Sequence, residues 1–330
     1  MPFRDVVGHR HLLDLVAGAV ARGSLPPSLI FAGPRGLGKR TAALALAQLV
    51  NCPAPVPGPD ACGTCASCTR IGRLVHADVL CVEPGDTGVI KVDQIRDAVE
   101  RTAYRPFEGR RRVVIIDEAD AMLSEAQNAL LKTLEEPPST SMFVLVTCSP
   151  DELLPTVRSR CQRLRFGRLP AGDIAAELMR SHEYSSADAY AAASAADGSL
   201  GLALDGGSTA LVEAREAAQE VLQHVASTSD PRRRLDSARV LAGGGDRDDL
   251  RRRLRALASM LRDLGVIGAV GTADERFLAN ADMQEPLQRL SRSFDRDRLS
   301  GAFAAIDRAL EAIDRNASPK IVADWLAFQL

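Results

Sequence analysis

A glycine-rich turn between an apolar run and a helical run constrains the fold of this chain most strongly. Residues 33–41 read GPRGLGKRT, follow the apolar run SLIF and continue into TAALALAQLV (41–50). A strand, a glycine turn and a helix in this order are typical of a phosphate-binding loop, where backbone N–H groups and a lysine contact phosphate oxygens. An accidental glycine turn is the alternative. The groups that such a loop needs are present in Gly33, Gly36, Gly38 and Lys39.

The residue after the lysine departs from the phosphate-loop motif. A serine or threonine there binds the magnesium ion that bridges the last two phosphates, and Arg40 cannot do so. Thr41 does not replace it, because one further helical step turns a side chain by about 100°. We therefore expect a phosphate cradle with impaired magnesium binding.

Strand-like and helix-like runs alternate after the loop. Two continuous apolar runs, in RVVIIDEAD (112–120) and FVLVTCSP (143–150), are typical of parallel strands that are covered on both faces. We also expect an amphipathic helix over 3–22, a strand over 77–84 and a helix over 92–103. This alternation predicts an α/β fold with a doubly wound parallel sheet.

Acidic residues follow the run VVII directly. Asp117 at the carboxyl end of a buried strand is placed to hold magnesium, and Glu118 beside it to orient a water molecule. Alternatively, Asp117 only caps the next helix. The phosphate loop upstream favours the first interpretation.

Four cysteines form the spacing C-x9-C-x2-C-x2-C around a segment rich in proline and glycine. They are Cys52, Cys62, Cys65 and Cys68. Four thiolates commonly hold a structural zinc ion, while an iron–sulfur cluster and unligated thiols are the alternatives. The other cysteines lie in or beside apolar strand runs, and we expect small buried residues at Cys81, Cys148 and Cys161.

Charge and composition narrow the class of protein. The formal net charge of −2, the pI near 6.3 and the 46% of hydrophobic residues are those of an ordinary folded protein, not of a basic nucleic-acid coat or a disordered tail. Any DNA contact is then local or made through partners. The N-terminal stretch is charged, and no uncharged apolar run reaches the roughly 18 residues of a membrane span. We therefore expect a cytoplasmic protein.

The second half of the chain reads as helical. After Pro170 the text is alanine-rich, with breaks at 197–199, 205–208 and 242–249. Leucines recur at helical spacing from Leu250 to Leu264, which predicts a core-facing helix.

Six segments, in their order along the chain, resemble the AAA+ ATPases, and more closely the bacterial clamp-loader subunits. They are FRDVVGH, GPRGLGK, the four-cysteine insert, IIDEAD, NALLKTLEEPP and TVRSRC. The resemblance is good over residues 1 to about 208, and residues 209–330 match only as generic collar-like helices. It implies a nucleotide-fold domain over 1–169 with the zinc insert at about 52–68, a small helical lid over 170–208 and a helical collar for oligomerisation over 209–330.

The resemblance also implies roles for single residues. Val6, Val7 and Gly8 would belong to the adenine pocket, Thr147 would be the first sensor, and Arg160 would be the arginine finger that reaches a neighbouring subunit's site in trans. From spacing alone, Arg160 could instead belong to a solvated basic strand edge in RSRCQRLRF. The second sensor arginine of active relatives is expected in the segment 198–201, where this chain has Gly201.

A damaged site with an intact finger motif resembles a poorly hydrolysing clamp-loader member that serves an adjacent motor. It implies ATP or ADP binding that is weak or absent, and structural Zn²⁺. Implied partners are the motor (gamma/tau) and delta subunits, the sliding clamp indirectly, and primer-template DNA through the complex, with no membrane. The alternatives are an ATP-hydrolysing gamma/tau-like motor and another AAA+ ATPase of DNA repair.

Overall fold

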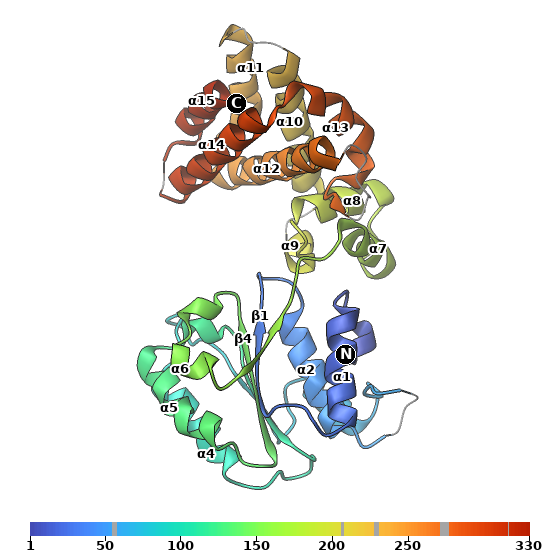
Figure 1. The fold of residues 1–330 in the computed structure, drawn as a ribbon, viewed down its shortest axis with the longest axis vertical. Coiled ribbons are helices and arrows are strands. Elements are labelled where there is room, and N and C mark those ends of the chain that lie inside the picture. Colours follow the sequence, from blue (N-terminus) through green and yellow to red (C-terminus); the bar gives the residue numbers. More distant parts are fainter. Residues whose placement is uncertain (55–57, 206–207, 228–230, 271–276, 316) are drawn as a thin grey trace. The chain divides into compact units, whose positions relative to one another are not determined.

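The chain forms two compact units, Met1–Gly167 and Arg168–Leu330, in a computed structural model that describes residues 1–330 except 55–57, 206–207, 228–230, 271–276 and 316. The first unit is a sheet flanked by helices, and the second is built of helices throughout its described part (Figure 1). The division of the chain into a domain over 1–169, a lid over 170–208 and a collar over 209–330 stays a prediction.

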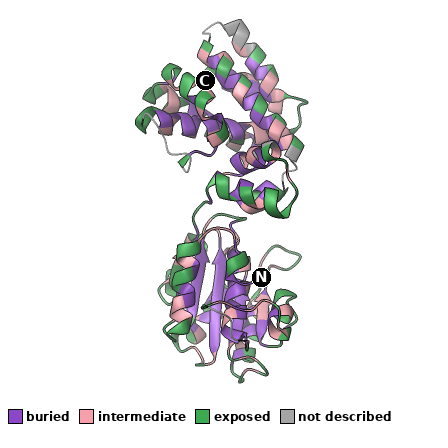
Figure 2. Ribbon diagram, turned by 90° about the vertical axis from the view of Figure 1, so that its right-hand side faces the viewer, coloured by how far each residue is buried: buried purple, intermediate pink, exposed green. Residues whose placement is uncertain are grey.

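Five parallel strands form the sheet of the N-terminal unit, in the order β2–β3–β4–β1–β5. The strands are β1 Ser28–Ala32, β2 Val79–Val82, β3 Arg112–Ile116, β4 Ser141–Thr147 and β5 Gln162–Arg165. Every residue of β1, β3 and β4 is buried, as continuous apolar runs predict for strands covered on both faces (Figure 2). The predicted doubly wound α/β fold is confirmed.

Helices cover both faces of this sheet. Leu29 and Phe31 pack with the buried side chains of α1 (Arg10–Ala21), α2 (Lys39–Asn51) and α3 (Ala66–Gly72). Ile30 and Ala32 pack on the opposite face with α4 (Val92–Thr102), α5 (Ser124–Glu135) and α6 (Pro155–Arg158). Successive strand residues therefore serve two separate clusters, as the alternation of side chains along a strand requires.

The strand register gathers the loops that follow the strands at one edge. Ala32 lies beside Thr147 on β4 and Arg165 on β5, and Val82 lies beside Ile116. The glycine turn after β1 therefore lies at the same edge as the acidic residues after β2 and β3. This edge is where ligands of parallel α/β sheets bind.

The predicted helix over 3–22 is wrong in its first part. Phe3–Asp5 form a single 3-10 turn, and α1 begins only at Arg10. Between them, Gly8 and His9 adopt positive φ angles of 67° and 54°, which interrupt a right-handed helix. The predicted strand over 112–120 is correct in place but ends at Ile116.

Helices α10 to α15 of the C-terminal unit pack around one large apolar cluster. The predicted leucine stripe from Leu250 to Leu264 lies on α12 and is fully buried in that cluster, which confirms a core-facing helix. The expected break at 242–249 falls between α11 and α12, that at 197–199 between α8 and α9, and that at 205–208 includes residues outside the described ones. The helices are α7 Ala171–Ser181, α8 Ser186–Ala195, α9 Leu200–Asp205, α10 Ser208–Ser227, α11 Pro231–Ala242, α12 Arg247–Val270, α13 Gln284–Leu290, α14 Arg296–Asp314 and α15 Pro319–Gln329.

Candidate functional site

The glycine turn after β1 has the backbone shape of a phosphate loop. Gly33 has a φ of 154°, and a Cβ there would lie 2.3 Å from the Phe166 carbonyl oxygen, so only glycine fits. Gly36 and Gly38 have φ angles of 71° and 76°. Gly38 is the N-cap of α2, so the turn delivers the chain to the N-terminus of a 13-residue helix. Such an end favours anions.

Lys39, the loop lysine, is folded back onto its own loop. Its Nζ donates hydrogen bonds to the carbonyl oxygens of Gly33, at 2.6 Å, and of Pro34, at 2.5 Å. Burial lowers the pKa of Lys39, and the nearby carboxylates of Asp117 and Asp120 act in the opposite direction. Among the described residues, the ammonium group has only neutral carbonyls as hydrogen-bond acceptors, and phosphate oxygens could replace them.

Arg40 lacks the hydroxyl of the motif and also pairs with two carboxylates at the ends of the strands. Its Nη1 donates to Asp117 Oδ2 at 3.2 Å, and its Nη2 pairs with Glu83 Oε1. Asp117 follows β3 and Glu83 follows β2, so a side chain from α2 bridges the ends of two strands. Mg²⁺ needs near-ideal oxygen coordination at about 2.0–2.1 Å. The guanidinium of Arg40 contacts Asp117 and prevents oxygen coordination of this kind around an ion. The residues at this position therefore do not fit Mg²⁺.

Two further predicted site residues lie at the same edge and already have partners. Glu118, with a φ of 48°, forms an ion pair with Arg35 at 3.5 Å. Thr147 is buried at the end of β4, and its Oγ1 donates to Asp120 Oδ1 at 2.7 Å. The structure therefore brings the glycine loop, Asp117, Glu118 and Thr147 together.

Asp120 and Glu83 also lie at this edge, and no motif in the sequence marked them. Asp120 accepts hydrogen bonds from Thr147 and from the backbone N–H and thiol of Cys148. Burial raises the pKa of Asp120, but these hydrogen bonds outweigh it and lower the pKa below its usual value. Glu83 could have been found by the argument used for Asp117, because each is the first residue after a strand of the sheet.

Of the residues expected to contact adenine, Val6 lies near the loop. Val6 is buried, and its Cγ1 is 3.9 Å from the position that a Gly38 Cβ would take. Val7 and Gly8 are half-buried. His9 stacks edge-on against Phe166 with ring centroids 4.8 Å apart, and its buried Nε2 has no hydrogen-bond partner among the described residues. Burial lowers the pKa of His9, so a neutral imidazole lines this wall.

Arg160 lies at the other edge of the sheet. It precedes β5, whose first residue, Gln162, pairs with Leu29 near the start of β1. Gly33 follows Leu29 by four residues, about 13 Å at the strand rise, and Arg160 lies in the turn before Gln162, beyond the opposite end of β5. Its guanidinium pairs with Glu135, and its Nη1 donates to Thr156 O at 2.9 Å. Arg160 does not serve the phosphate loop of its own chain.

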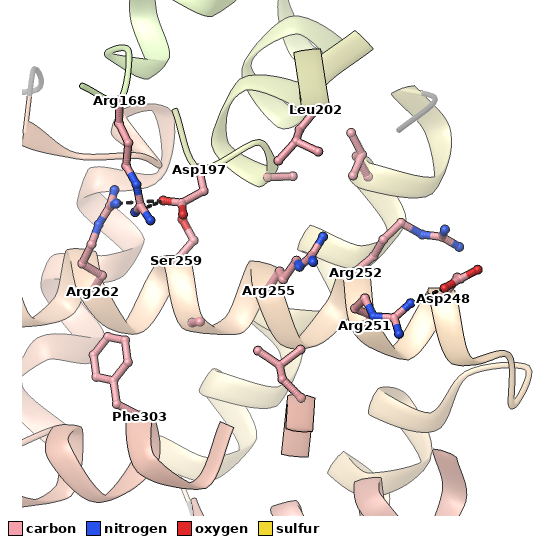
Figure 3. A pocket seen from close by; sticks show the side chains of 14 residues that line it. Arg168, Asp197, Leu202, Asp248, Arg251, Arg252, Arg255, Ser259, Arg262 and Phe303 are labelled. Atoms are coloured by element: carbon pink, nitrogen blue, oxygen red, sulfur yellow. Dashed lines mark hydrogen bonds and ion pairs between the residues drawn. The ribbon is translucent and has the colours of Figure 1, made fainter. Parts of the chain in front are cut away.

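The segment expected to carry a second sensor arginine begins α9. Gly201 lies in its first turn and offers no side chain. Arg168 and Arg262, from elsewhere in the unit, both pair with Asp197, at 2.5 and 3.3 Å (Figure 3). They line a cavity of about 860 Å³ with three further arginines and apolar side chains of α9, α10 and α14. Within this unit, both guanidinium groups are thus held by one carboxylate.

The four predicted cysteines converge into one cluster. Cys52 follows α2, Cys65 caps α3 and Cys68 lies on α3, and all four sulfurs lie within 4.8 Å of one another. A tetrahedral ion about 2.3 Å from each sulfur would separate them by about 3.8 Å, and the sulfurs of Cys62 and Cys68 are 3.9 Å apart. This donor set fits a metal ion.

Backbone N–H groups support the sulfurs of the cluster. Cys62 N–H donates to Cys52 Sγ, Cys65 N–H to Cys62 Sγ and Cys68 N–H to Cys65 Sγ, at 3.3–3.4 Å. The bond from Cys65 is the largest cause that lowers the pKa of Cys62, to about 6, whereas burial raises the pKa of Cys68. A thiolate at neutral pH is the form that binds metal.

The remaining cysteines were predicted to be buried, and that is correct only for Cys161. Cys81 and Cys148 are half-buried, and their thiols donate to Glu83 and Asp120. Cys81 lies in β2, an edge strand of the sheet, and Cys148 directly follows β4. None of the helices in the described part of the chain combines the length and apolar character that a membrane span requires.

Comparisons with known proteins find similarity to subunits of DNA polymerase III. Residues 8–170 match the family model described as "DNA polymerase III, delta subunit". Similar curated proteins include DNA polymerase III subunit gamma/tau of Mycobacterium tuberculosis (36% identity over 178 residues, 54% of this chain and 31% of that protein) and subunit tau of Bacillus subtilis (38% over 177 residues, 53% and 31%). The chain thus spans less than a third of the length of these relatives. A gamma subunit-related protein from Thermotoga maritima aligns over 96% of this chain and 97% of its own, with 18% identity and a TM-score of 0.42.

Proposed function

We propose that this chain is a delta-prime-like subunit of a bacterial DNA polymerase III clamp loader, because residues 8–170 match the DNA polymerase III delta subunit family model and 177–178 residues are 36–38% identical to gamma/tau and tau subunits. In this role it helps to load a sliding clamp onto primed DNA without acting as a motor. Its partners are the gamma/tau and delta subunits, and it meets the clamp and the primer-template DNA through the complex.

The pair between Arg40 and Asp117 carries this proposal. An ATPase of this class needs a hydroxyl and an acid on Mg²⁺, and here the acid is paired with the residue that replaced the hydroxyl. Gly201 adds a second loss at the segment expected to hold a sensor arginine. The chain's own hydrolysis is therefore weak or absent.

Arg160 supplies the catalytic contribution, in trans. A planar guanidinium stabilises the negative charge that builds on a phosphoryl group as it leaves, without proton transfer. Arg160 lies at the end of β5 opposite to its own loop, with its guanidinium on Glu135 and the Thr156 carbonyl, and this position supports action on a neighbour's site. Its pair with Glu135 must open when it docks.

The decisive experiment reconstitutes the complex with Arg160→Ala and measures assembly and DNA-stimulated ATP turnover with the clamp present. Arginine fingers accelerate hydrolysis by about 10³–10⁵-fold, but a ring with several motor sites loses only the share of the site that this finger serves. We expect intact assembly, reduced turnover and impaired loading. Arg158→Ala is the matched control, since Arg158 is similarly exposed and pairs with Asp151. Unchanged turnover and loading in Arg160→Ala would leave Arg160 as a surface charge.

The other predicted site residues take supporting roles in this proposal. Val6, Val7 and Gly8 form the wall against which an adenine ring would pack, and Thr147 with Asp120 forms the polar group of the first sensor. The cysteine cluster holds a structural Zn²⁺, because four sulfurs close the coordination sphere and leave no open position for catalysis.

The second candidate is a gamma/tau-like motor. Lys39, Asp117 and Glu118 are all present at the ligand edge, and the curated relatives are gamma/tau and tau subunits. Steady ATP hydrolysis by the isolated chain, abolished by Glu118→Gln, would establish the motor. Identification of the proteins that co-purify with the chain separates both clamp-loader candidates from an AAA+ ATPase of DNA repair.

A further inference from the structure

Arg40 occupies the place of a metal ion within the candidate nucleotide site. Its guanidinium group contacts Asp117 at the end of β3 and Glu83 at the end of β2, and it lies in the first turn of α2, whose N-terminus faces the glycine loop. A divalent cation at this position would have to displace a charge that is covalently part of the chain. We propose that Arg40 replaces Mg²⁺, so that this site binds a nucleoside diphosphate free of metal.

The charges around the loop favour such a ligand. Arg40 neutralises the carboxylates of Asp117 and Glu83, which would otherwise repel phosphate, and Arg35 pairs with Glu118. Lys39 has only carbonyl acceptors and can turn to phosphate. A guanidinium carries five N–H donors, so its contacts with two carboxylates leave others for phosphate oxygens.

The same set of cations favours a diphosphate over a triphosphate. Backbone N–H groups, the α2 N-terminus and Lys39 meet two phosphates in a loop of this kind. A third phosphate adds negative charge next to Asp117 and Glu118, and without Mg²⁺ no ion shares it. A site built in this way holds one nucleotide as a structural ligand and does not cycle between two.

This inference rests on the proposed function only in assuming that the glycine loop binds nucleotide. The test measures binding of a fluorescent ADP derivative, mant-ADP, to the full chain in excess EDTA and in excess Mg²⁺. For the unmodified chain we expect tighter binding in EDTA than in excess Mg²⁺, because Mg²⁺ draws mant-ADP into a soluble complex that this site does not take and so lowers the concentration of the free ligand. Arg40→Ala should weaken binding in EDTA by roughly 10- to 100-fold, as expected for lost hydrogen bonds to a charged group.

Arg40→Thr provides the reciprocal result. It restores a hydroxyl beside Asp117, so Mg²⁺ should now strengthen mant-ADP binding by roughly tenfold or more. Arg96→Ala, an exposed arginine on α4, is the matched control and should behave like the unmodified chain. Binding by the unmodified chain that requires Mg²⁺, or no binding under either condition, overturns the inference. Either result leaves the role of Arg160 standing, since that role is measured at a neighbour's site.

Discussion

Asp78 is a buried carboxylate that anchors the N-terminal unit and gives a quantitative test of its stability. It lies just before β2, and its side chain is fully buried. It accepts hydrogen bonds from the backbone N–H groups of Phe107, Glu108 and Gly109, at 2.7–2.9 Å, and from Arg112 Nη2 at 3.0 Å. One carboxylate therefore ties the approach to β3 to the start of β2, the strand that leads to Glu83.

The magnitude follows from the pKa of Asp78. Burial by itself raises this pKa, but the three N–H donors and Arg112 outweigh burial and lower the pKa from 3.8 to about 2. This lowering corresponds to roughly 2–3 kcal/mol of folding free energy. Because the folded pKa is lowered, this stabilisation is complete above the unfolded pKa and is lost as the pH falls toward 2. About half of it remains at pH 3.

The perturbation is Asp78→Asn, which keeps the shape and removes the charge. We expect it to reduce the free energy of unfolding by at least about 2 kcal/mol at pH 7 and by clearly less at pH 3. Asp93→Asn is the control, because Asp93 is exposed and its ion pair with Arg96 is 3.6 Å long; it should change stability by less than about 0.5 kcal/mol. Urea unfolding of the full chain, with hydrogen exchange of the β2 and β3 amides, measures both. An equal loss at the two pH values, or a loss no larger than that of the control, refutes the reasoning.

Two further predictions concern the glycine loop and the cysteine cluster. Gly33→Ala should cost roughly 1–3 kcal/mol and lower the Tm, because its Cβ would lie 2.3 Å from Phe166 O, whereas Gly85→Ala has open space and should not; equal Tm values would contradict this. The unmodified chain should carry about one zinc ion, Cys65→Ser should lose it with disorder of the loop, and Ser67→Ala should keep it. Elemental analysis that finds iron, or no metal after purification without chelators, would count against zinc.

The sequence was sufficient where a pattern had one physical cause. The runs VVII in β3 and FVLV in β4 are apolar at every position, and burial on both faces explains them. The cysteine spacing likewise predicted a cluster that the fold forms. The helix expected over 3–22 failed because its apolar periodicity does not reveal the positive φ angles of Gly8 and His9. Cys81 and Cys148 were misjudged because the sequence does not show that β2 is an edge strand or that β4 ends at Thr147.

The partner of Arg40 is beyond what a motif can predict, and it changes how Asp117 is interpreted. The motif shows that a hydroxyl is missing, but the pairing with Glu83 depends on β2 lying next to β3, a property of the sheet order. Taken alone, the intact acid favours a motor. Paired with Arg40, Asp117 has a structural reason to be present, so it no longer argues for hydrolysis. Arg40→Thr should therefore admit Mg²⁺ without restoring turnover, since Gly201 still leaves the second sensor position empty.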